Sequence, residues 1–309
     1  MIAIIGAGWY GCIAADFFLS HNIDFVIFDQ SGIFTGSSYN NQNRLHIGFH
    51  YARSKLTRDM CVDSYHYIKS NFPDLIKEVD NNYYAISNQS LIDLGTYQHI
   101  FDPIGYEVID DPMTNITNVQ GVISVNECFI EHKKARKYWE DRLSAYLQIK
   151  KVELDNLDNY DLIIDRTNNA FELIPNTKIE YSLSLVYRNR DKLNLAVTIV
   201  DGDFCSLYPY DLDNKLYTLT SVLHTPIDDN FIDLDTKRKL MEEEANMYFK
   251  EFFSDFEYVD HFISKKVKPK YKDDRKTLLI SKTNEKIYSV ACCKISRIKN
   301  WREFFRKRV

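Results

Sequence analysis

The apolar residues of this chain form two kinds of segment, which follow one another along the sequence. Short apolar runs predict buried strands, and segments in which apolar residues recur every three or four positions predict helices. The helical segments span residues 12–20, 56–72, 131–147 and 236–253, and a basic helix ends the chain. The strand-like runs span residues 2–5, 25–29, 83–86, 119–125, 160–165, 278–280 and 287–292.

From residue 179 onward the pattern changes to alternating β segments. Three of these segments, at 192–200, 203–208 and 215–224, are separated by Asp201-Gly202 and by Asp213-Asn214. Both pairs are typical of tight turns between antiparallel strands. This part of the chain therefore predicts an antiparallel meander.

The first strand runs directly into a glycine-rich turn, Gly6, Gly8 and Gly11, in the spacing G-x-G-x-x-G. Gly6 permits a tight turn, Gly8 lets the backbone approach a pyrophosphate, and Gly11 lets the following helix pack closely on the strand. The helix N-terminus offers free N–H groups to an anion. Asp29 ends the next strand, where a carboxylate can accept hydrogen bonds from a ribose. The segment predicts dinucleotide binding.

The order of the elements predicts an α/β chain, α+β overall, in two parts. A Rossmann-type cofactor domain is expected from residues 1–80, 126–170 and 270–309. An inserted antiparallel-sheet substrate domain is expected from residues 81–125 and 171–269. The active site would then lie between the two, where ligand sites are common.

Composition narrows the class of protein. The chain has 309 residues, of which 45% are hydrophobic and 27% charged, as in ordinary globular proteins. The net charge of -5 argues against a general nucleic-acid binder. Six cysteines without a C-x-x-C spacing predict reduced thiols and no metal site. With a strand from residue 2 and no run long enough to span a bilayer, we expect a cytoplasmic protein; its oligomeric state stays open.

A second motif, between residues 36 and 51, distinguishes NAD from FAD. It reads small-Ser-x-x-Asn, later followed by His46-x-Gly48, soon after the ribose-binding acid. In this segment the chain resembles the D-amino acid oxidase-like FAD-dependent oxidoreductases, in which such a loop runs under the flavin. Residues 43–61 are most similar to the L-2-hydroxyglutarate oxidase and glycerol-3-phosphate dehydrogenase branch.

The resemblance implies FAD, held noncovalently, and a small-molecule substrate. Residues that it places at the cofactor are Gly6, Gly8, Trp9, Tyr10, Gly11, Asp29, Gln30, Ser37, Ser38, Asn43, Arg44, Leu45, His46, Thr167, Lys294 and Ile295. It places His46, His50 and Arg275 in catalysis, the histidines as proton acceptors and the arginine as a carboxylate ligand. Other candidates for the carboxylate ligand are Arg53, Arg188 and Arg190, but Arg275 matches the closing segment of the family best. Arg44 has two interpretations, a cofactor contact or a loop support, and Tyr51 is expected in the core. A covalent flavin link through His46 or Cys61 is a further hypothesis.

The expected reaction is oxidation of a C–OH or C–NH bond by hydride transfer to the flavin, on a hydroxy acid, an amino acid or a sugar-linked substrate. Two departures leave another reading open, because Asn168 and Cys293 stand where the family has glycine. The alternatives are a non-redox flavoprotein such as a sugar mutase, and a dinucleotide-binding pseudoenzyme with a regulatory role. The basic C-terminal helix could either contact an anionic membrane or, as we favour, pack on the cofactor domain.

Overall fold

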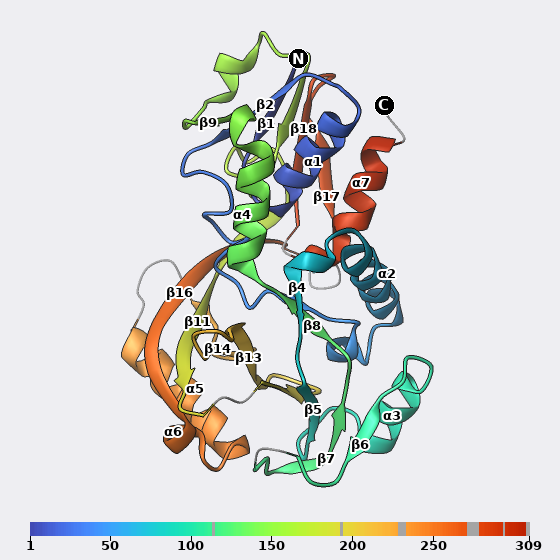
Figure 1. The fold of residues 1–309 in the computed structure, drawn as a ribbon, viewed down its shortest axis with the longest axis vertical. Coiled ribbons are helices and arrows are strands. Elements are labelled where there is room, and N and C mark those ends of the chain that lie inside the picture. Colours follow the sequence, from blue (N-terminus) through green and yellow to red (C-terminus); the bar gives the residue numbers. More distant parts are fainter. Residues whose placement is uncertain (113–114, 192–193, 228–232, 271–277, 293, 307–309) are drawn as a thin grey trace.

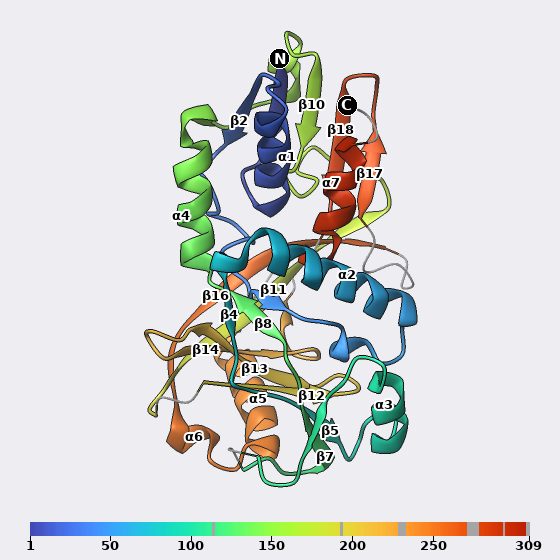
Figure 2. The same cartoon turned by 45° about the vertical axis from the view of Figure 1, so that its right-hand side comes forward.

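Two large sheets of different character stack along the long axis of the molecule (Figure 1). The computed structural model describes residues 1–112, 115–191, 194–227, 233–270, 278–292 and 294–306. Both chain ends lie beside the smaller sheet, and the larger sheet forms the opposite end of the molecule (Figures 1 and 2). The mixed α/β architecture confirms the fold class expected from the sequence.

The smaller sheet is largely parallel and carries the nucleotide-binding turn. Within the described residues it has six strands in the order β17-β18-β10-β1-β2-β9. Their bounds are β1 Ile2–Ile5, β2 Phe25–Asp29, β9 Leu147–Ile149, β10 Leu162–Asp165, β17 Leu279–Lys282 and β18 Ile287–Ala291. The wholly apolar β1 is buried between β10 and β2, as a central parallel strand should be.

The larger sheet carries the antiparallel meander. In the part of the chain that the structure describes it has nine strands, and β5 and β12 form its parallel pair. Their bounds are β5 Asn81–Ser87, β6 Glu107–Ile109, β7 Val119–Ser124, β11 Thr177–Asn189, β12 Leu195–Val200, β13 Cys205–Asp211, β14 Leu216–Ser221, β15 Pro226–Ile227 and β16 Phe256–Pro269. A small sheet of β3 Arg44–Leu45, β8 Cys128–Ile130 and β4 Ile76–Glu78 lies between the two. The predicted domain boundaries themselves remain a prediction.

Helices cover the outer faces of both sheets. Their bounds are α1 Trp9–Ser20, α2 Lys55–Asn71, α3 Leu94–Phe101, α4 His132–Leu143, α5 Leu234–Tyr248, α6 Phe252–Asp255 and α7 Ile298–Arg306. One hydrophobic core joins the small sheet to α1, α4 and α7, and another joins the large sheet to α5 and α6. Among the described helices, none has both the length and the apolar character needed to cross a bilayer.

The C-terminal helix α7 packs on the first helix of the chain. Trp301 and Phe305 are buried, and the indole of Trp301 donates a hydrogen bond to the carbonyl of Tyr10, 2.8 Å away. The two helices lie side by side in both views (Figures 1 and 2). The apolar face of α7 is therefore covered by protein, and its lysines and arginines lie around that covered face.

Three elements differ from the sequence-based expectations. Helix α4 ends at Leu143, and Leu147 instead opens strand β9, where it pairs with Ile27. The helix expected at 236–253 is two helices, because Phe249 is extended and forms a bridge with Ile116. Strand β16, which pairs with β11 along its whole length, was not predicted.

Candidate cofactor and active site

A cavity of about 1240 Å³ lies between the two sheets. The nucleotide-binding turn and the loop 35–44 line one side of it. Strands β11, β13, β14 and β16 of the large sheet line the other side. The end of β18 and the start of the C-terminal segment close it near Lys294. A ligand in this cavity would touch both parts of the molecule.

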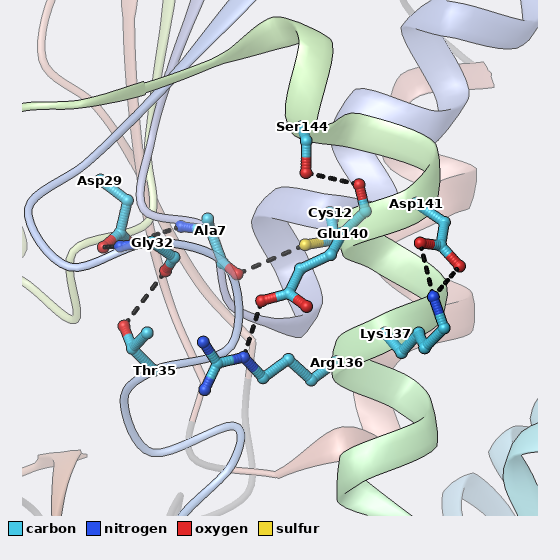
Figure 3. A network of polar contacts seen from close by, with 10 residues as sticks. All are labelled: Ala7, Cys12, Asp29, Gly32, Thr35, Arg136, Lys137, Glu140, Asp141 and Ser144. Atoms are coloured by element: carbon cyan, nitrogen blue, oxygen red, sulfur yellow. Dashed lines mark hydrogen bonds and ion pairs between the residues drawn. The ribbon is translucent and has the colours of Figure 1, made fainter.

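The turn after β1 has the close contacts that the glycine motif predicts. A Cβ added to Gly11 would lie 1.9 Å from the carbonyl oxygen of Gly6, so only glycine allows helix α1 to pack this close to the turn. The carboxylate of Asp29 accepts hydrogen bonds from the backbone N–H groups of Ala7 and Gly32, at 2.8 and 3.1 Å (Figure 3). Asp29 thereby ties β2 to the turn while it lines the cavity.

The N-terminus of α1 opens toward this cavity without an acidic cap. Its N-cap residue is Gly8, and its first turn contains no acidic residue. The hydroxyl of Ser38 accepts a hydrogen bond from the N–H of Trp9 at 3.0 Å. The positive end of the helix is thus left for an external anion, as in other dinucleotide-binding turns.

Of the two positions at which this chain lacks the glycine of the family pattern, 168 and 293, only the first lies among the described residues. Asn168 lines the cavity and has a φ of 55°, the left-handed conformation that asparagine tolerates better than most residues. Glycine is therefore not required for the backbone conformation at this position. Cys293 and Arg275 lie outside the described residues.

Arg166, just before Asn168, is a buried cation at the cavity wall. Its guanidinium carbon lies 4.3 Å from the centroid of the Tyr10 ring, and it donates a hydrogen bond to the carbonyl of Val290. Burial lowers the pKa of Arg166 from its usual value. Arginine in this position adds positive charge beside the glycine turn, which the sequence pattern did not anticipate.

Arg44 lies at the centre of a buried polar network. Its guanidinium donates hydrogen bonds to the hydroxyls of Tyr84 (2.9 Å) and Thr198 (2.8 Å). Its Nε has no hydrogen-bond partner among the described residues. Burial alone would lower the pKa of Arg44, but nearby tyrosines and a carboxylate outweigh it, and the net shift is upward. Arg44 therefore stays charged at the cavity wall.

The carboxylate in this network is Glu127, which sequence reasoning missed. It accepts hydrogen bonds from the hydroxyl of Tyr84 at 2.7 Å and from the backbone N–H groups of Ile47 and Gly48, at 2.6 and 3.3 Å. Burial raises the pKa of Glu127, and Arg44 and these hydrogen bonds oppose the rise. Glu127 thus fixes the loop before His50 by direct hydrogen bonds. It also fixes Arg44 indirectly, through the hydroxyl of Tyr84.

A second cluster surrounds Tyr51. The ring centroids of His46 and His50 lie 5.4 and 5.2 Å from that of Tyr51. The ammonium of Lys294 lies 4.6 Å from the same ring and donates a hydrogen bond to the Tyr51 hydroxyl. Burial, and then the charge of Arg44, lower the pKa of Lys294 to about 8. Tyr51 is buried as expected, but it also lines the cavity.

Most of the residues predicted at the cofactor come together around this cavity. Those that line it are Gly6, Gly8, Trp9, Tyr10, Gly11, Asp29, Gln30, Ser37, Ser38, Asn43, Arg44, His46, Thr167, Lys294 and Ile295. His50 also lines it. Leu45 is not among the described residues that line this cavity; it lies in the apolar core and pairs with Cys128. Cys61 is buried in α2 and is not among the described lining residues of this cavity.

These residues fit FAD. The uncapped helix N-terminus and the buried cation Arg166 suit its pyrophosphate, Asp29 suits its ribose, and the cavity continues past Ser38 to Arg44 and Lys294. Asn168, with a φ of 55°, also lines this cavity. No cluster of three or more metal-ligating side chains occurs among the described residues.

Comparisons with known proteins agree with this geometry. No protein-family model matches the chain. The FAD-dependent monooxygenase FPY4 of Fusarium mangiferae is 32% identical over 326 residues, which cover 96% of this chain and 88% of that protein. The crystal structure of glycine oxidase from Geobacillus kaustophilus superposes with a TM-score of 0.72 at 12% identity, covering 98% of this chain and 91% of that one.

The crystal structure of iminodiacetate oxidase from Chelativorans sp. BNC1 superposes with a TM-score of 0.76 at 8% identity and covers 98% of this chain and 92% of that one. At such low identities the solved structures show the fold, whereas the full-length relative shows the family. The more specific branch suggested by residues 43–61 remains a prediction. The chain belongs to the FAD-dependent oxidoreductases that include the monooxygenase FPY4, built on the D-amino acid oxidase-like fold, and its cofactor is FAD.

Proposed function

We propose that this enzyme oxidises a small anionic substrate at a C–OH or C–NH bond, with transfer of a hydride to FAD. The observation that carries this proposal is the positive charge of the cavity in an acidic chain. Among the described residues, nine lysines and arginines line the cavity against four aspartates and glutamates. The whole chain has a net charge of -5, so the positive charge is concentrated at the site. Such a cavity attracts anions.

Two of these cations stand where the cavity meets the large sheet. Arg44 is fixed by Tyr84 and Thr198, and Lys294 reaches the same region from the C-terminal segment. Glu127 compensates one of the two charges, because it is the acidic side chain in the Arg44 network. A bound carboxylate or phosphate would compensate the other. This argues for an anionic substrate.

The remaining chemistry needs a hydride acceptor and a proton acceptor. FAD, when bound, accepts the hydride that leaves the substrate carbon. The proton that leaves the substrate oxygen or nitrogen needs a base, and His46 and His50 are the histidines at the cavity wall. Molecular oxygen or a quinone then reoxidises the cofactor. In this scheme Arg44 and Lys294 orient the substrate, and the histidines move the proton.

The test is anaerobic reduction of the purified FAD-loaded enzyme by candidate substrates. Panels of 2-hydroxy acids, amino acids and sugar acids are mixed with it in the absence of NAD(P)H. The absorbance of the oxidised flavin, at about 450 nm, is followed. We expect one panel to bleach the flavin. If no acid bleaches an enzyme that retains its FAD, the proposal is wrong.

Monooxygenation is a second candidate, favoured by the activity named for the relative FPY4. This reaction inserts one atom of molecular oxygen into the substrate and reduces the other to water, with two electrons from NAD(P)H. It predicts bleaching by NAD(P)H and incorporation of ¹⁸O from labelled oxygen into the product. Bleaching by the substrate alone, without labelled product, would exclude it.

A further inference from the structure

The cavity-facing side of the large sheet is lined with hydroxyl groups. Along β11, Leu183 and Leu185 enter the hydrophobic core beneath α5, so Ser182 and Ser184 face the other way, toward the cavity. Strands alternate their side chains between two faces, and here one face is apolar and the other carries hydroxyls. The alternation therefore builds a polar cavity wall.

The strand register extends this wall across the sheet. Ser206 of β13 lies opposite Thr220 of β14, and Ser264 of β16 lies opposite Ser182. Residues that lie opposite each other in antiparallel strands have side chains on the same face. We define the hydroxyl wall as the following cavity-lining residues: Ser182, Ser184, Ser206, Thr220 and Ser264.

The hydroxyl wall has unused hydrogen-bonding capacity. Ser182 is 1% exposed, and its hydroxyl has no hydrogen-bond partner among the described residues, although the residue lines the cavity. The hydroxyls of Ser206 and Thr220 share a hydrogen bond of 3.0 Å, and that of Ser206 also accepts one from Gln42 Nε2 at 3.4 Å; a hydroxyl has one donor and two acceptor sites, so each keeps at least one further site. A buried hydroxyl without a hydrogen-bond partner is unfavourable, because it has given up its bonds to water. A ligand with its own hydroxyls would remove that cost.

The hydroxyl wall is continuous with the cationic end of the cavity. Ser206 lies opposite Thr198 of β12, and the hydroxyl of Thr198 accepts the hydrogen bond from Arg44. The same sheet face therefore carries an anion-binding group and then a series of hydroxyls. A small molecule that matches it has an acidic group at one end and several hydroxyls along its length.

We propose that the substrate is a polyhydroxylated anion, a sugar acid or a sugar phosphate, and that the hydroxyl wall selects it. This inference rests on the proposed function, since it names the substrate class of the same site. An apolar acid or an amino acid with an apolar side chain would leave the wall unpaired. A site that hydrogen-bonds the hydroxyls of its substrate strongly rejects analogues without those hydroxyls.

The test compares matched acids on the FAD-loaded enzyme. D-gluconate and hexanoate have the same chain length and charge but differ in their hydroxyls, and glucose 6-phosphate replaces the carboxylate by phosphate. Dissociation constants come from perturbation of the flavin spectrum. We expect D-gluconate, glucose 6-phosphate or both to bind at least about tenfold more tightly than hexanoate. Equal binding of all three would overturn the inference.

Two variants locate the effect. Thr220→Val and Ser184→Ala remove hydroxyls from the wall, and each should weaken the polyhydroxylated ligand about tenfold and leave hexanoate unchanged. The control is Thr218→Val, the same change two residues away on β14, because the hydroxyl of Thr218 bonds the carbonyl of Tyr208 and Thr218 is not among the described lining residues. Weaker binding of FAD itself, by fluorescence titration, would assign the wall to the cofactor and overturn the inference.

The two proposals fail separately. Bleaching of the flavin by amino acids or simple hydroxy acids, with no sugar acid or sugar phosphate active, would overturn the inference and support the proposed function. Tight binding of D-gluconate without bleaching by any acid would overturn the proposed oxidation while the selectivity for hydroxyls stands. Bleaching by a sugar acid or a sugar phosphate, lost in Thr220→Val and kept in Thr218→Val, supports both.

Discussion

The guanidinium of Arg44 lies over the ring of Tyr208, with its carbon 4.4 Å from the centroid of the ring. The same guanidinium donates two hydrogen bonds, so its position is fixed from two directions. A lysine could supply the charge but neither the stacking nor the planar pair of donors. Arg44 is therefore a positioned cation, and its geometry should matter as much as its charge.

Arg44→Lys should weaken carboxylate binding about tenfold. The measurement is a titration of the FAD-loaded enzyme with acetate, followed by the flavin spectrum. Arg188→Lys, at an exposed position outside the described lining of the cavity, is the control and should bind acetate like the unchanged protein. An Arg44→Lys enzyme that binds acetate normally would show that charge alone is enough.

Glu127→Gln should destabilise the fold by about 1–3 kcal/mol. The buried carboxylate accepts hydrogen bonds from Tyr84, Ile47 and Gly48 with its two oxygens. The amide of glutamine has one oxygen that accepts and one nitrogen that only donates, so it cannot replace both oxygens. Urea unfolding measures the change. Glu78→Gln, which removes an exposed partner of Lys69, should change stability by less than about 1 kcal/mol. Equal effects of the two would refute the role of Glu127.

Gly11→Ala should abolish FAD binding, because the added Cβ would lie 1.9 Å from the backbone of Gly6. The turn or the helix would have to move, and the pyrophosphate site with it. Gly36→Ala, where no atom lies within 4 Å of the added Cβ, should retain FAD. Flavin content after purification measures both. A yellow Gly11→Ala protein with a normal FAD dissociation constant would contradict the prediction.

The stability of the FAD-free protein should rise with pH between about 8 and 10.5 because of Lys294. Its folded pKa lies below the unfolded value, so in this window the unfolded chain binds more protons than the folded one, and raising the pH favours folding. Below pH 8 both states are protonated and the trend ends. Urea unfolding across this range should show the rise, and Lys294→Met should reduce it. An identical pH profile for the variant would disprove it.

Asn168→Gly should leave FAD affinity within about threefold of the starting value, because asparagine already holds the left-handed conformation with a φ of 55°. Asn168→Val should lower FAD affinity more strongly, since a β-branched residue is a strained occupant of that conformation. Fluorescence titration of FAD measures both. A large gain in affinity from Asn168→Gly would instead support the pseudoenzyme alternative.

Sequence reasoning found the features that depend on local spacing. The turn around Gly8 and the acid Asp29 belong to one short strand-turn-helix-strand segment. The spacing within this segment is therefore enough to predict that Asp29 lies beside the turn. The same holds for the loop with His46. For Leu45 the pattern was insufficient, because only the pairing of β3 with β8 decides which side of the loop faces the core.

Features that depend on distant strands could not be predicted in this way. Glu127 is a lone carboxylate after β7, and its partners Tyr84 and Ile47 lie 43 and 80 residues away in the sequence. Nothing near Glu127 marks it as buried. Strand β16 has scattered lysines and no clear alternation, and its pairing with β11 becomes visible only in the folded sheet. The hydroxyl wall likewise needs the register of separate strands.

The hydrogen bond between Trp301 and Tyr10 joins the two ends of the chain, 291 residues apart. During synthesis the glycine-rich turn emerges well before α7, which covers part of α1, and before β17 and β18, which complete its sheet. The part of the apolar surface of α1 that α7 covers stays exposed until α7 is made, and until then it is open to aggregation or to chaperones. A chain that lacks helix α7 would leave part of α1 without its apolar cover, and we therefore expect it to be less stable than the intact chain.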